Sequence, residues 1–449
     1  MGLPYADAVQ RVQNEARCQR ASFLSRTEPC SIYDACNRIV PEAVYSPIST
    51  PEYDTSAMDG FALSSAASQT ASPESPVRFE VQGITTAGDE PHSDLHDRRS
   101  ALPPCVEIMT GAPFPRGPEA ERFDCCVPVE EVVESEDKLS NRRCISIAKP
   151  ARRHQHRRFA GGDFGKRDLI LEPGERIAPR HVMAMASVGL MEVAVLRKPR
   201  IAVFSTGCEL LSRDAMGRRH PYMIPDANGP YLTTVLRKWG VDADFCGVGR
   251  DHAETMHQAI ATTLARKQYD GILTSGAVSA GRCDMIPDVV HGLGGRPVFH
   301  KVAVKPGHPV LFSMLPAANH REIAFFGLPG NPVAAAACLR FLVRPYLQTL
   351  QLQELEPPHV ARLQMSTNGD ADGQKPSNGT STTASMTFRE EPDIFRPAIL
   401  SPSKQQVRII DDHSPGKTKP FLHANCWVHI PRGVSELCED EMVNVYPCE

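Results

Sequence analysis

Leu273-Thr-Ser-Gly-Ala-Val-Ser-Ala-Gly-Arg-Cys-Asp284, Lys301-Val-Ala-Val-Lys-Pro-Gly-His-Pro309 and Phe326-Gly-Leu-Pro-Gly-Asn-Pro332 are three glycine-containing turns that follow one another closely in the chain. The first and third come after short apolar runs and before helical patterns. A buried strand, a tight glycine turn and a helix N-terminus direct free N–H groups and the positive end of the helix dipole at one point. We therefore expect a site for a phosphorylated or oxyanionic ligand, with Asp284 and Lys305 reaching into it.

The chain around these turns alternates strand-like and helix-like segments from Arg200 onward, which indicates an α/β domain. In a doubly wound sheet, turns of this kind collect along the carboxyl edge of the strands, where ligands bind. Strands are predicted at 201–204, 245–248 and 272–274, and helices at 226–240, 252–267 and 332–350. In the last helix, Asn331 is the natural N-cap and Pro332 the first-turn proline.

Outside the α/β domain, helices are predicted at the start of the chain and before Gly189, and most of the remaining segments are predicted to be β structure. Residues 1–45 resemble entry helices, and Pro179 to Gly189 a further helix. A small β-barrel or sandwich is predicted at about 64–150 from β-like runs at 77–84, 105–109, 125–133 and 144–148. Residues 366–385 are rich in Ser, Thr, Asn and Gly and predict a disordered insertion. A terminal β domain is expected from runs at 398–400, 406–410, 426–430 and 442–445.

Length and composition exclude several classes of protein. A chain of 449 residues is too long for one core, so about three domains are expected. The formal net charge of −4 and the lack of a long basic tail argue against a nucleic-acid-binding protein. There is no apolar run of membrane-spanning length and no signal-peptide pattern. The 14 cysteines are scattered without a CxxC pair, which predicts a reduced, cytoplasmic protein without a zinc site or disulfide framework.

Acidic residues recur at predicted strand ends, namely Glu209, Asp226, Asp251 and Asp284. A single Asp at a helix start is usually an N-cap, and Asp226 or Asp284 alone fits that interpretation. Four carboxylates on adjacent turns of one sheet edge, beside phosphate-binding turns, are what a Mg²⁺–nucleotide site requires. Lys301 lies four residues before Lys305 in an extended segment, so alternation places both on one face.

Two other polar segments allow two interpretations each. Asp54, Ser56 and Asp59 cluster beside Met58 and Phe61, and composition alone favours neither a plain loop nor a functional one. The basic run 151–159 is favoured as a solvated face, and a phosphate-facing role is the minority interpretation.

Five of these segments together resemble the molybdopterin molybdotransferase (molybdenum insertase) family, which includes the carboxy-terminal domain of gephyrin. The matching segments begin at Pro51-Glu-Tyr-Asp-Thr-Ser-Ala-Met-Asp, Ile108-Met-Thr-Gly-Ala-Pro, Pro199-Arg-Ile-Ala-Val-Phe-Ser-Thr-Gly, Lys305-Pro-Gly-His-Pro and Leu328-Pro-Gly-Asn-Pro. The likeness extends from about residue 34 to the end and is thinnest after 356.

The resemblance implies a multidomain α/β plus β fold. It implies a linker domain of two segments, 1–45 and 151–198, around an inserted β domain at 46–150. An α/β molybdopterin-binding domain like that of molybdopterin adenylyltransferase is implied at 199–352, and a C-terminal β-barrel at 356–449.

The resemblance also implies an activity and its partners. The family inserts molybdenum from molybdate into adenylylated molybdopterin, releases AMP and requires Mg²⁺. It implies a homodimer whose active cleft is shared between subunits. Because the chain has no second copy of the α/β motif, a separate molybdopterin adenylyltransferase is expected as a partner. The alternative is a catalytically degenerate, gephyrin-like scaffold or regulatory protein that keeps the fold and the dimer.

The site residues that the resemblance implies fall into two groups. The catalytic group is Asp59, Glu209, Asp251, Asp284, Lys301 and Lys305, of which Glu209, Asp251 and Asp284 are the expected metal ligands. The substrate-binding group is Thr110, Ser205, Thr206, Gly207, Asp226, Asn228, Ser275, Gly276, Ser279, Gly281, Pro306, Gly307, Pro329, Gly330, Asn331 and Arg396. The chain departs from the family pattern at Cys208, Ala227, Ala277, Ala334 and Glu391, and such losses of hydroxyls and a cation predict weaker oxyanion binding.

Overall fold

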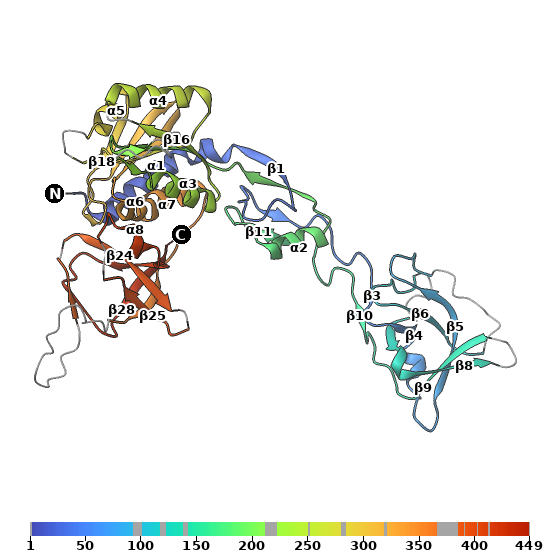
Figure 1. The fold of residues 1–449 in the computed structure, drawn as a ribbon. Coiled ribbons are helices and arrows are strands. Elements are labelled where there is room, and N and C mark those ends of the chain that lie inside the picture. Colours follow the sequence, from blue (N-terminus) through green and yellow to red (C-terminus); the bar gives the residue numbers. More distant parts are fainter. Residues whose placement is uncertain are drawn as a thin grey trace, which may run out of the picture.

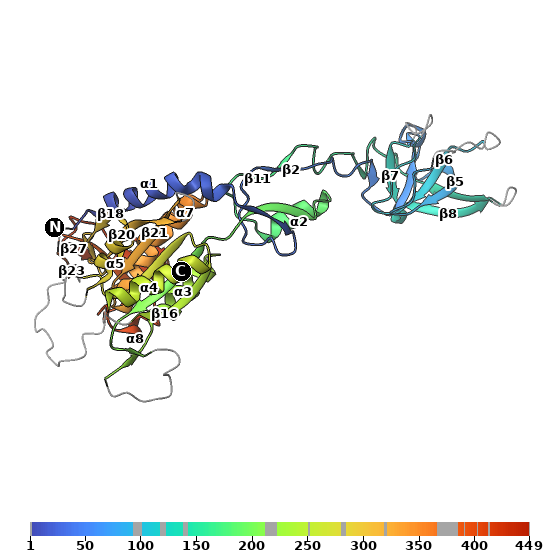
Figure 2. The same cartoon turned by 90° about the horizontal axis from the view of Figure 1, so that it is seen from above.

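The computed structural model shows an elongated chain, with the α/β part and the C-terminal part packed against each other at one end (Figure 1; Figure 2). A small linker follows, and a β domain lies at the far end. No helix in the described part of the chain is long and apolar enough to cross a membrane. The structure describes residues 2–92, 101–116, 123–137, 142–211, 222–249, 252–279, 284–317, 321–365, 385–389, 391–401, 403–411 and 414–448.

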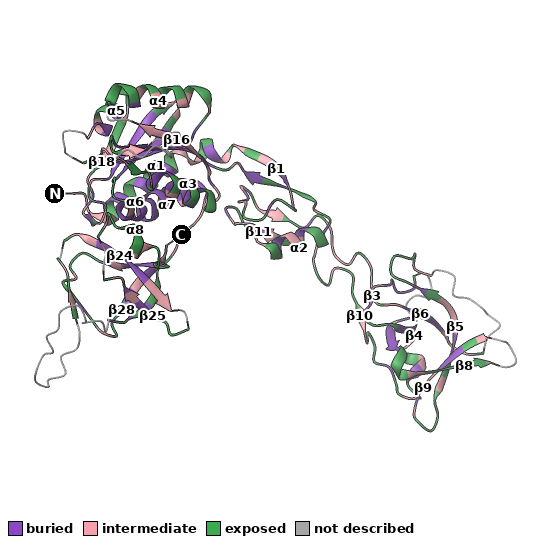
Figure 3. Cartoon of the chain, viewed as in Figure 1, coloured by how far each residue is buried: buried purple, intermediate pink, exposed green. Residues whose placement is uncertain are grey.

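The α/β part is built on a six-stranded sheet with the order β16-β13-β17-β21-β20-β18. The first four strands of this order run parallel, and the last two pair antiparallel. The strands are β13 (Arg200–Thr206), β16 (Asp242–Gly249), β17 (Gly271–Ser275), β18 (Arg296–His300), β20 (Leu311–Ala317) and β21 (Arg321–Leu328). All five residues of β17 are buried, as expected for a central parallel strand covered on both faces. Figure 3 shows buried residues in purple between the helices of the α/β part.

Two layers of helices cover this sheet. One face packs against α3 (Asn228–Lys238), α6 (Pro332–Cys338) and α7 (Arg344–Leu350), and the other against α4 (Ala253–Arg266) and α5 (Ile286–Gly292). On the first face the rings of Phe312 and Phe326 stack with centroids 4.4 Å apart, and Tyr346 packs edge-on against both. The strands predicted at 201–204, 245–248 and 272–274 and the helices predicted at 226–240 and 252–267 are confirmed.

The predicted helix after Pro332 is interrupted rather than uniform. Between α6 and α7 the residues Leu339–Val343 form a π-helical segment. Pro345 follows directly, and it has no N–H to donate to the preceding turn. A wider turn accommodates such a residue without ending the helix.

The N-terminal helix α1 (Tyr5–Leu24) packs with the α/β part, although the implied linker range includes it. Its buried residues Ala8, Val12, Ala16 and Phe23 recur at helical spacing and belong to the same core as α7. The small linker core is instead formed by β1 (Thr27–Ser31) with β12 (Glu192–Leu196), β2 (Val44–Tyr45) with β11 (Leu169–Leu171), and α2 (Pro179–Ser187).

The distal β domain contains a six-stranded sheet with the order β7-β4-β6-β5-β9-β8. Its strands are β4 (Gly60–Leu63), β5 (Val77–Thr85), β6 (Pro104–Ile108), β7 (Cys125–Pro128), β8 (Val132–Asp137) and β9 (Arg142–Ile147). The run predicted as one strand at 125–133 is two, because a 3₁₀ turn (Val129–Glu131) follows Pro128. The chain enters and leaves this domain side by side, where β3 (Thr55–Ser56) pairs with β10 (Arg157–Arg158).

The C-terminal part is a closed five-stranded barrel, as predicted. Its strands follow the order β24-β25-β22-β28-β26, and β26 pairs back to β24. They are β22 (His359–Leu363), β24 (Asp393–Ser401), β25 (Gln406–Ile409), β26 (Cys426–Ile430) and β28 (Met442–Pro447). The two-residue strand β19 (Val304–Lys305) from the α/β part pairs with β24 and joins the two parts. Most of the predicted insertion, 366–384, lies outside the described residues, and Ser385 begins the short strand β23 (Ser385–Thr387).

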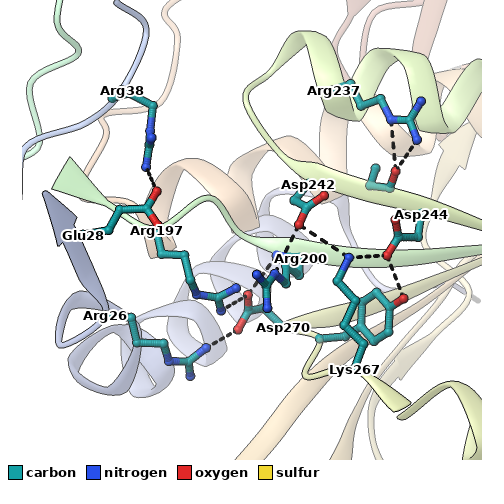
Figure 4. Close-up of polar contacts among 12 residues, drawn as sticks. Arg26, Glu28, Arg38, Arg197, Arg200, Arg237, Asp242, Asp244, Lys267 and Asp270 are labelled. Carbon is teal, nitrogen blue, oxygen red and sulfur yellow. Dashed lines mark hydrogen bonds and ion pairs between the residues drawn. The ribbon is translucent and has the colours of Figure 1, made fainter. Parts of the chain in front are cut away.

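Asp270 forms an ion cluster where the linker meets the sheet (Figure 4). Its carboxylate accepts hydrogen bonds from Arg26 at 2.5 Å, from Arg197 at 3.1 Å and from the backbone N–H of Arg200 at 2.8 Å. Arg321 lies 3.4 Å away on the strand that pairs with β17. Arg26 precedes β1 and Arg197 follows β12, so one carboxylate holds both connections between the α/β part and the linker.

Replacing Asp270 with alanine should lower the free energy of unfolding by about 3–5 kcal/mol, because it leaves three partly buried arginines without their anion. Asp242→Ala is the matched control, since that carboxylate is 42% exposed and its pairs with Arg200 and Lys267 contribute at most about 1 kcal/mol. Urea unfolding of both variants measures the difference, and equal losses would contradict the assigned role of Asp270.

Candidate active site

A cavity of about 540 Å³ opens at the carboxyl ends of the parallel strands. The turns after β13, β17 and β21 form its floor, as the sequence predicts for this sheet edge. Its lining includes Thr206, Gly207, Glu209, Asp226, Asn228, Ser275, Gly276, Ser279, Asp284, Pro329, Gly330 and Asn331. The structure thus brings twelve of the predicted site residues together in this cavity. It is called the pterin-side cavity below, after the ligand that the sequence resemblance implies.

Hydrogen bonds between the three turns fix the floor of the pterin-side cavity. The side-chain nitrogen of Asn228 donates to the Ser275 hydroxyl at 2.6 Å and to the Gly330 carbonyl at 2.7 Å. The Thr206 hydroxyl donates to the Ser275 carbonyl at 3.0 Å. Asn228 is 9% exposed and so holds the β17 and β21 turns together from inside. The backbone amides of the turns are thereby positioned before a ligand arrives.

Gly276 is required at the tightest of these turns. Its φ is +102°, and a Cβ there would lie 2.3 Å from the Thr206 carbonyl oxygen. The neighbouring Ala277 has a φ of +53°, which is an unusual conformation for a residue with a side chain. The close approach of two backbones at Gly276 leaves the cavity open where an anion would lie.

The predicted carboxylates have different roles in the structure. Glu209 and Asp284 line the pterin-side cavity. Asp226 also lines it, but its Oδ1 accepts the N–H groups of Asn228 and Gly229 at 3.0 and 3.1 Å, which caps α3. Asp251, the third predicted metal ligand, lies outside the described residues. Among the described residues there is no group of three or more potential metal ligands.

A second cavity of about 510 Å³ adjoins the first and lies against the C-terminal barrel. It shares Pro329 and Asn331 with the pterin-side cavity, and Lys305, Pro306, Gly307 and Arg396 line it. Lys305 comes from β19 and Arg396 from β24, which pair with each other. We call it the oxyanion cavity because two cationic side chains line it. These side chains come from two different parts of the chain.

Arg396 is the most informative residue of the oxyanion cavity. It is only 8% exposed, yet its guanidinium makes no hydrogen bond or ion pair with another described residue. Burial lowers the pKa of Arg396, because a buried cation without an anion is unfavourable. A buried, unpaired guanidinium on the wall of a cavity is suited to bind an anion there.

Two predicted residues of the α/β part do not line either cavity. Lys301 has a φ of +74°, and its N–H donates to the Val310 carbonyl, so the extended segment assumed for Lys301 and Lys305 is broken. Ser205 lies within β13, and its hydroxyl is buried. Gly281 lies outside the described residues.

Asp59 and Thr110 lie in the distal β domain, far from both cavities of the same chain (Figure 1). The Asp59 carboxylate accepts hydrogen bonds from the Thr110 N–H at 2.6 Å and from its hydroxyl at 2.7 Å. These bonds lower the pKa of Asp59, the backbone bond most. Asp59 is therefore an exposed, ionised group held in one orientation.

The sequence-based reasoning missed a wall contributed by the C-terminal part. Ser414 and Pro415 line the oxyanion cavity, and Gly416 lines the pterin-side cavity. The Pro415 carbonyl accepts the N–H of Val333 at 3.0 Å, so this turn also satisfies the first turn of α6. The only available signal was the Ser-Pro-Gly turn itself, which is common in loops.

The amino-acid sequence matches two family models over most of its length. Residues 3–189 match the model described as the MoeA N-terminal region (domain I and II). Residues 202–349 match the model described as the probable molybdopterin binding domain.

Several known proteins are similar to this chain over most of the length of both chains. The molybdopterin molybdenumtransferase of Synechococcus elongatus is 31% identical over 80% of this chain and 83% of its own. That of Haemophilus influenzae is 32% identical over 77% of this chain and 78% of its own. A solved molybdopterin biosynthesis MoeA protein from Pyrococcus horikoshii, 28% identical, superposes with a TM-score of 0.76 over the full length of both chains.

Replacing Gly276 with alanine should destabilise the fold by roughly 2 kcal/mol or more, because the new Cβ meets the Thr206 carbonyl at a positive φ. Gly330→Ala is the control, since its Cβ would meet Gly276 at an ordinary 3.5 Å. Thermal unfolding compares the two variants. A Gly276→Ala protein as stable as Gly330→Ala would refute the packing argument.

Replacing Thr110 with valine should raise the pKa of Asp59 part of the way to its ordinary value, because the hydroxyl donor is lost and the backbone donor stays. A lowered pKa means that the interaction stabilises the fold at neutral pH and is lost as the pH falls through that pKa. Carboxyl NMR titration of Asp59 measures the shift, and an unchanged midpoint would show that the hydroxyl has no effect.

Proposed function

The chain belongs to the molybdopterin molybdenumtransferase family, and we propose on that premise how its two cavities divide the reaction. It is a transferase of molybdenum cofactor biosynthesis. The pterin-side cavity holds the adenylylated molybdopterin, and the oxyanion cavity holds molybdate. Because the two cavities share Pro329 and Asn331, the two substrates would lie side by side during the insertion of molybdenum.

The observation that carries this proposal is that Arg396, which has no partner among the described residues, lines the same cavity as Lys305. Molybdate is a tetrahedral dianion, and Asp411 is the one acidic side chain among the described residues that line this cavity with the two cations. An arginine can donate two parallel hydrogen bonds to such an oxyanion, and a lysine adds a compact charge. Ala334 lines the same cavity, so one wall has a methyl group in place of the hydroxyl of the family pattern.

The pterin-side cavity suits the phosphate groups of the other substrate. Its floor has three glycine-containing turns, and phosphate oxygens bind well to the backbone N–H groups of such turns. Asn228 holds two of these turns in place from below. Release of AMP requires cleavage of the phosphoanhydride between the molybdopterin phosphate and the adenylate, and a fixed set of N–H donors stabilises the charge that develops there.

Magnesium is part of the same proposal. Glu209 and Asp284 are hard oxygen donors on the wall of the pterin-side cavity, which fits the preference of Mg²⁺ for carboxylate and phosphate oxygens. With Asp251 they would hold the ion. When bound, Mg²⁺ neutralises phosphate charge and orients the leaving group.

We further propose a homodimer and a separate adenylyltransferase chain. Asp59 and Thr110 are far from both cavities of their own chain (Figure 2), so a second copy would have to bring its β domain to the cleft. The preceding adenylylation is assigned in this proposal to a separate chain. A cytoplasmic location stays a prediction.

Arg396→Gln and Lys305→Ala should each raise the molybdate concentration needed for half-maximal AMP release by about 10–100-fold, because each removes a charged donor worth roughly 1.5–3 kcal/mol. Arg408→Gln, on the same barrel but outside the cavity, is the matched control. The assay follows AMP release from adenylylated molybdopterin as molybdate is varied.

Two results would count against the proposal at different levels. Unchanged molybdate dependence in both variants would remove molybdate from the oxyanion cavity while leaving the reaction intact. No AMP release by the wild-type protein, with molybdate and Mg²⁺ present, would overturn the proposed reaction and favour a scaffold role.

A further inference from the structure

A third cavity, of about 640 Å³, lies where the linker meets the α/β part, away from the active-site cavities. One wall comes from the linker segments around Asn37 and Arg176. The other comes from the end of α3, with Trp239, and from α7 with the residues after it. We call it the junction cavity. Its volume is in the range of small-molecule sites.

The lining of the junction cavity is strongly cationic. One lining residue, Asp34, is acidic, and six are basic: Arg38, Arg176, Lys198, Arg237, Lys238 and Arg344. Arg38 is paired with Glu28 at 2.5 Å, and Arg344 with Glu356 at 2.9 Å.

Three of the basic residues have no carboxylate partner in the described part of the chain. Arg176 donates to the Asn37 carbonyl and to the side-chain oxygen of Gln353. Arg237 donates to the Ala243 carbonyl, and Lys198 is exposed without an ion pair. Within the part of the chain that the structure describes, the cavity therefore has more positive than negative charge.

Two of the cations on the walls are partly buried. Burial most of all, and then the nearby Arg340 and Arg176, lower the pKa of Arg344 to about 10, although its partner Glu356 acts in the opposite direction. Burial also lowers the pKa of Arg176. The guanidinium of Arg344 lies 5.0 Å from the ring centre of Trp239, and the Trp239 indole N–H is buried with no hydrogen-bond partner among the described residues. An anion would relieve the repulsion between these cations.

A smaller cavity of about 450 Å³ adjoins the junction cavity and shares Arg38, Lys198 and Arg237 with it. Its other basic residues are already paired, Arg197 with Asp270 and Arg200 with Asp242, and the acidic residues Glu28 and Asp242 also line it (Figure 4). Among the described residues, the positive charge without a carboxylate partner therefore lies at the junction cavity.

We propose that the junction cavity is a second ligand site, which binds a small phosphorylated molecule carrying at least two negative charges. Phosphate oxygens match the guanidinium groups that line the cavity from both of its walls. The few apolar lining residues, such as Leu347, exclude a mainly apolar ligand. Because the walls belong to the linker and to the α/β part, the bound ligand also holds these two parts together.

Inorganic tripolyphosphate is a suitable probe, and the protein contains its own reporter. Of the two tryptophans, Trp239 lines the junction cavity, and Trp427 is fully buried in the barrel. Titration of the full-length protein, without divalent metal and at low ionic strength, should give a saturable change in tryptophan emission. Lys305→Ala should leave the midpoint unchanged, because Lys305 lies in the oxyanion cavity.

The double variant Arg176→Gln, Lys198→Gln should weaken tripolyphosphate binding at least tenfold. Arg180→Gln with Lys149→Gln removes the same charge from exposed positions outside the cavity and should change binding less than twofold. If the first variant does not fold, Lys198→Gln alone, at an exposed side chain, should still weaken binding about threefold.

Three results would overturn the proposal. These are an emission that tripolyphosphate does not change, equal binding by the cavity and control variants, and loss of binding in Lys305→Ala. Calorimetric titration of the same proteins checks that the emission change corresponds to one ligand per chain.

Discussion

The carboxylate of Asp270 is the interaction on which the arrangement of the chain most depends. It lies just before the central strand β17 and is almost fully buried. Around it are Arg26, just before β1, Arg197, just after β12, and Arg321 at the start of β21. Two of these arginines lie on the two connections that leave the α/β part for the linker. A single buried carboxylate thus fixes the position of the linker relative to the α/β part, and the position of the distal β domain depends on that of the linker.

The same sheet has different roles at its two edges. At the carboxyl edge, glycine turns held by Asn228 form the pterin-side cavity, and the pairing of β19 with β24 closes the oxyanion cavity beside it. At the amino edge, arginines and lysines anchor the linker and surround the junction cavity. Parallel strands separate the two chemistries because all their carboxyl ends lie on one side.

Local patterns predicted much of this structure. The alternation after Arg200 and the short C-terminal strands gave the α/β domain and the barrel correctly, because periodicity and turn residues act over a few positions. Long-range features were not predictable in this way. The partners of Asp270 lie 51 to 244 positions away in the sequence. Lys305 and Arg396 line one cavity because β19 of the α/β part pairs with β24 of the barrel, which no local pattern indicates. Lys301 was misplaced because a left-handed residue breaks the strand alternation assumed for it.

The distal domain has one more property, which follows from the pairing of β3 with β10. The chain enters this domain through β3 and leaves it through β10, and Thr55 pairs with Arg158 and Ser56 with Arg157. The domain is therefore an insertion that is attached through two adjacent strands. Such an insertion folds around its own core, here the apolar clusters on the sheet β7-β4-β6-β5-β9-β8. This inserted domain can therefore become longer or shorter, or be exchanged, during evolution without a change in the fold of the α/β domain, provided that β3 and β10 stay paired.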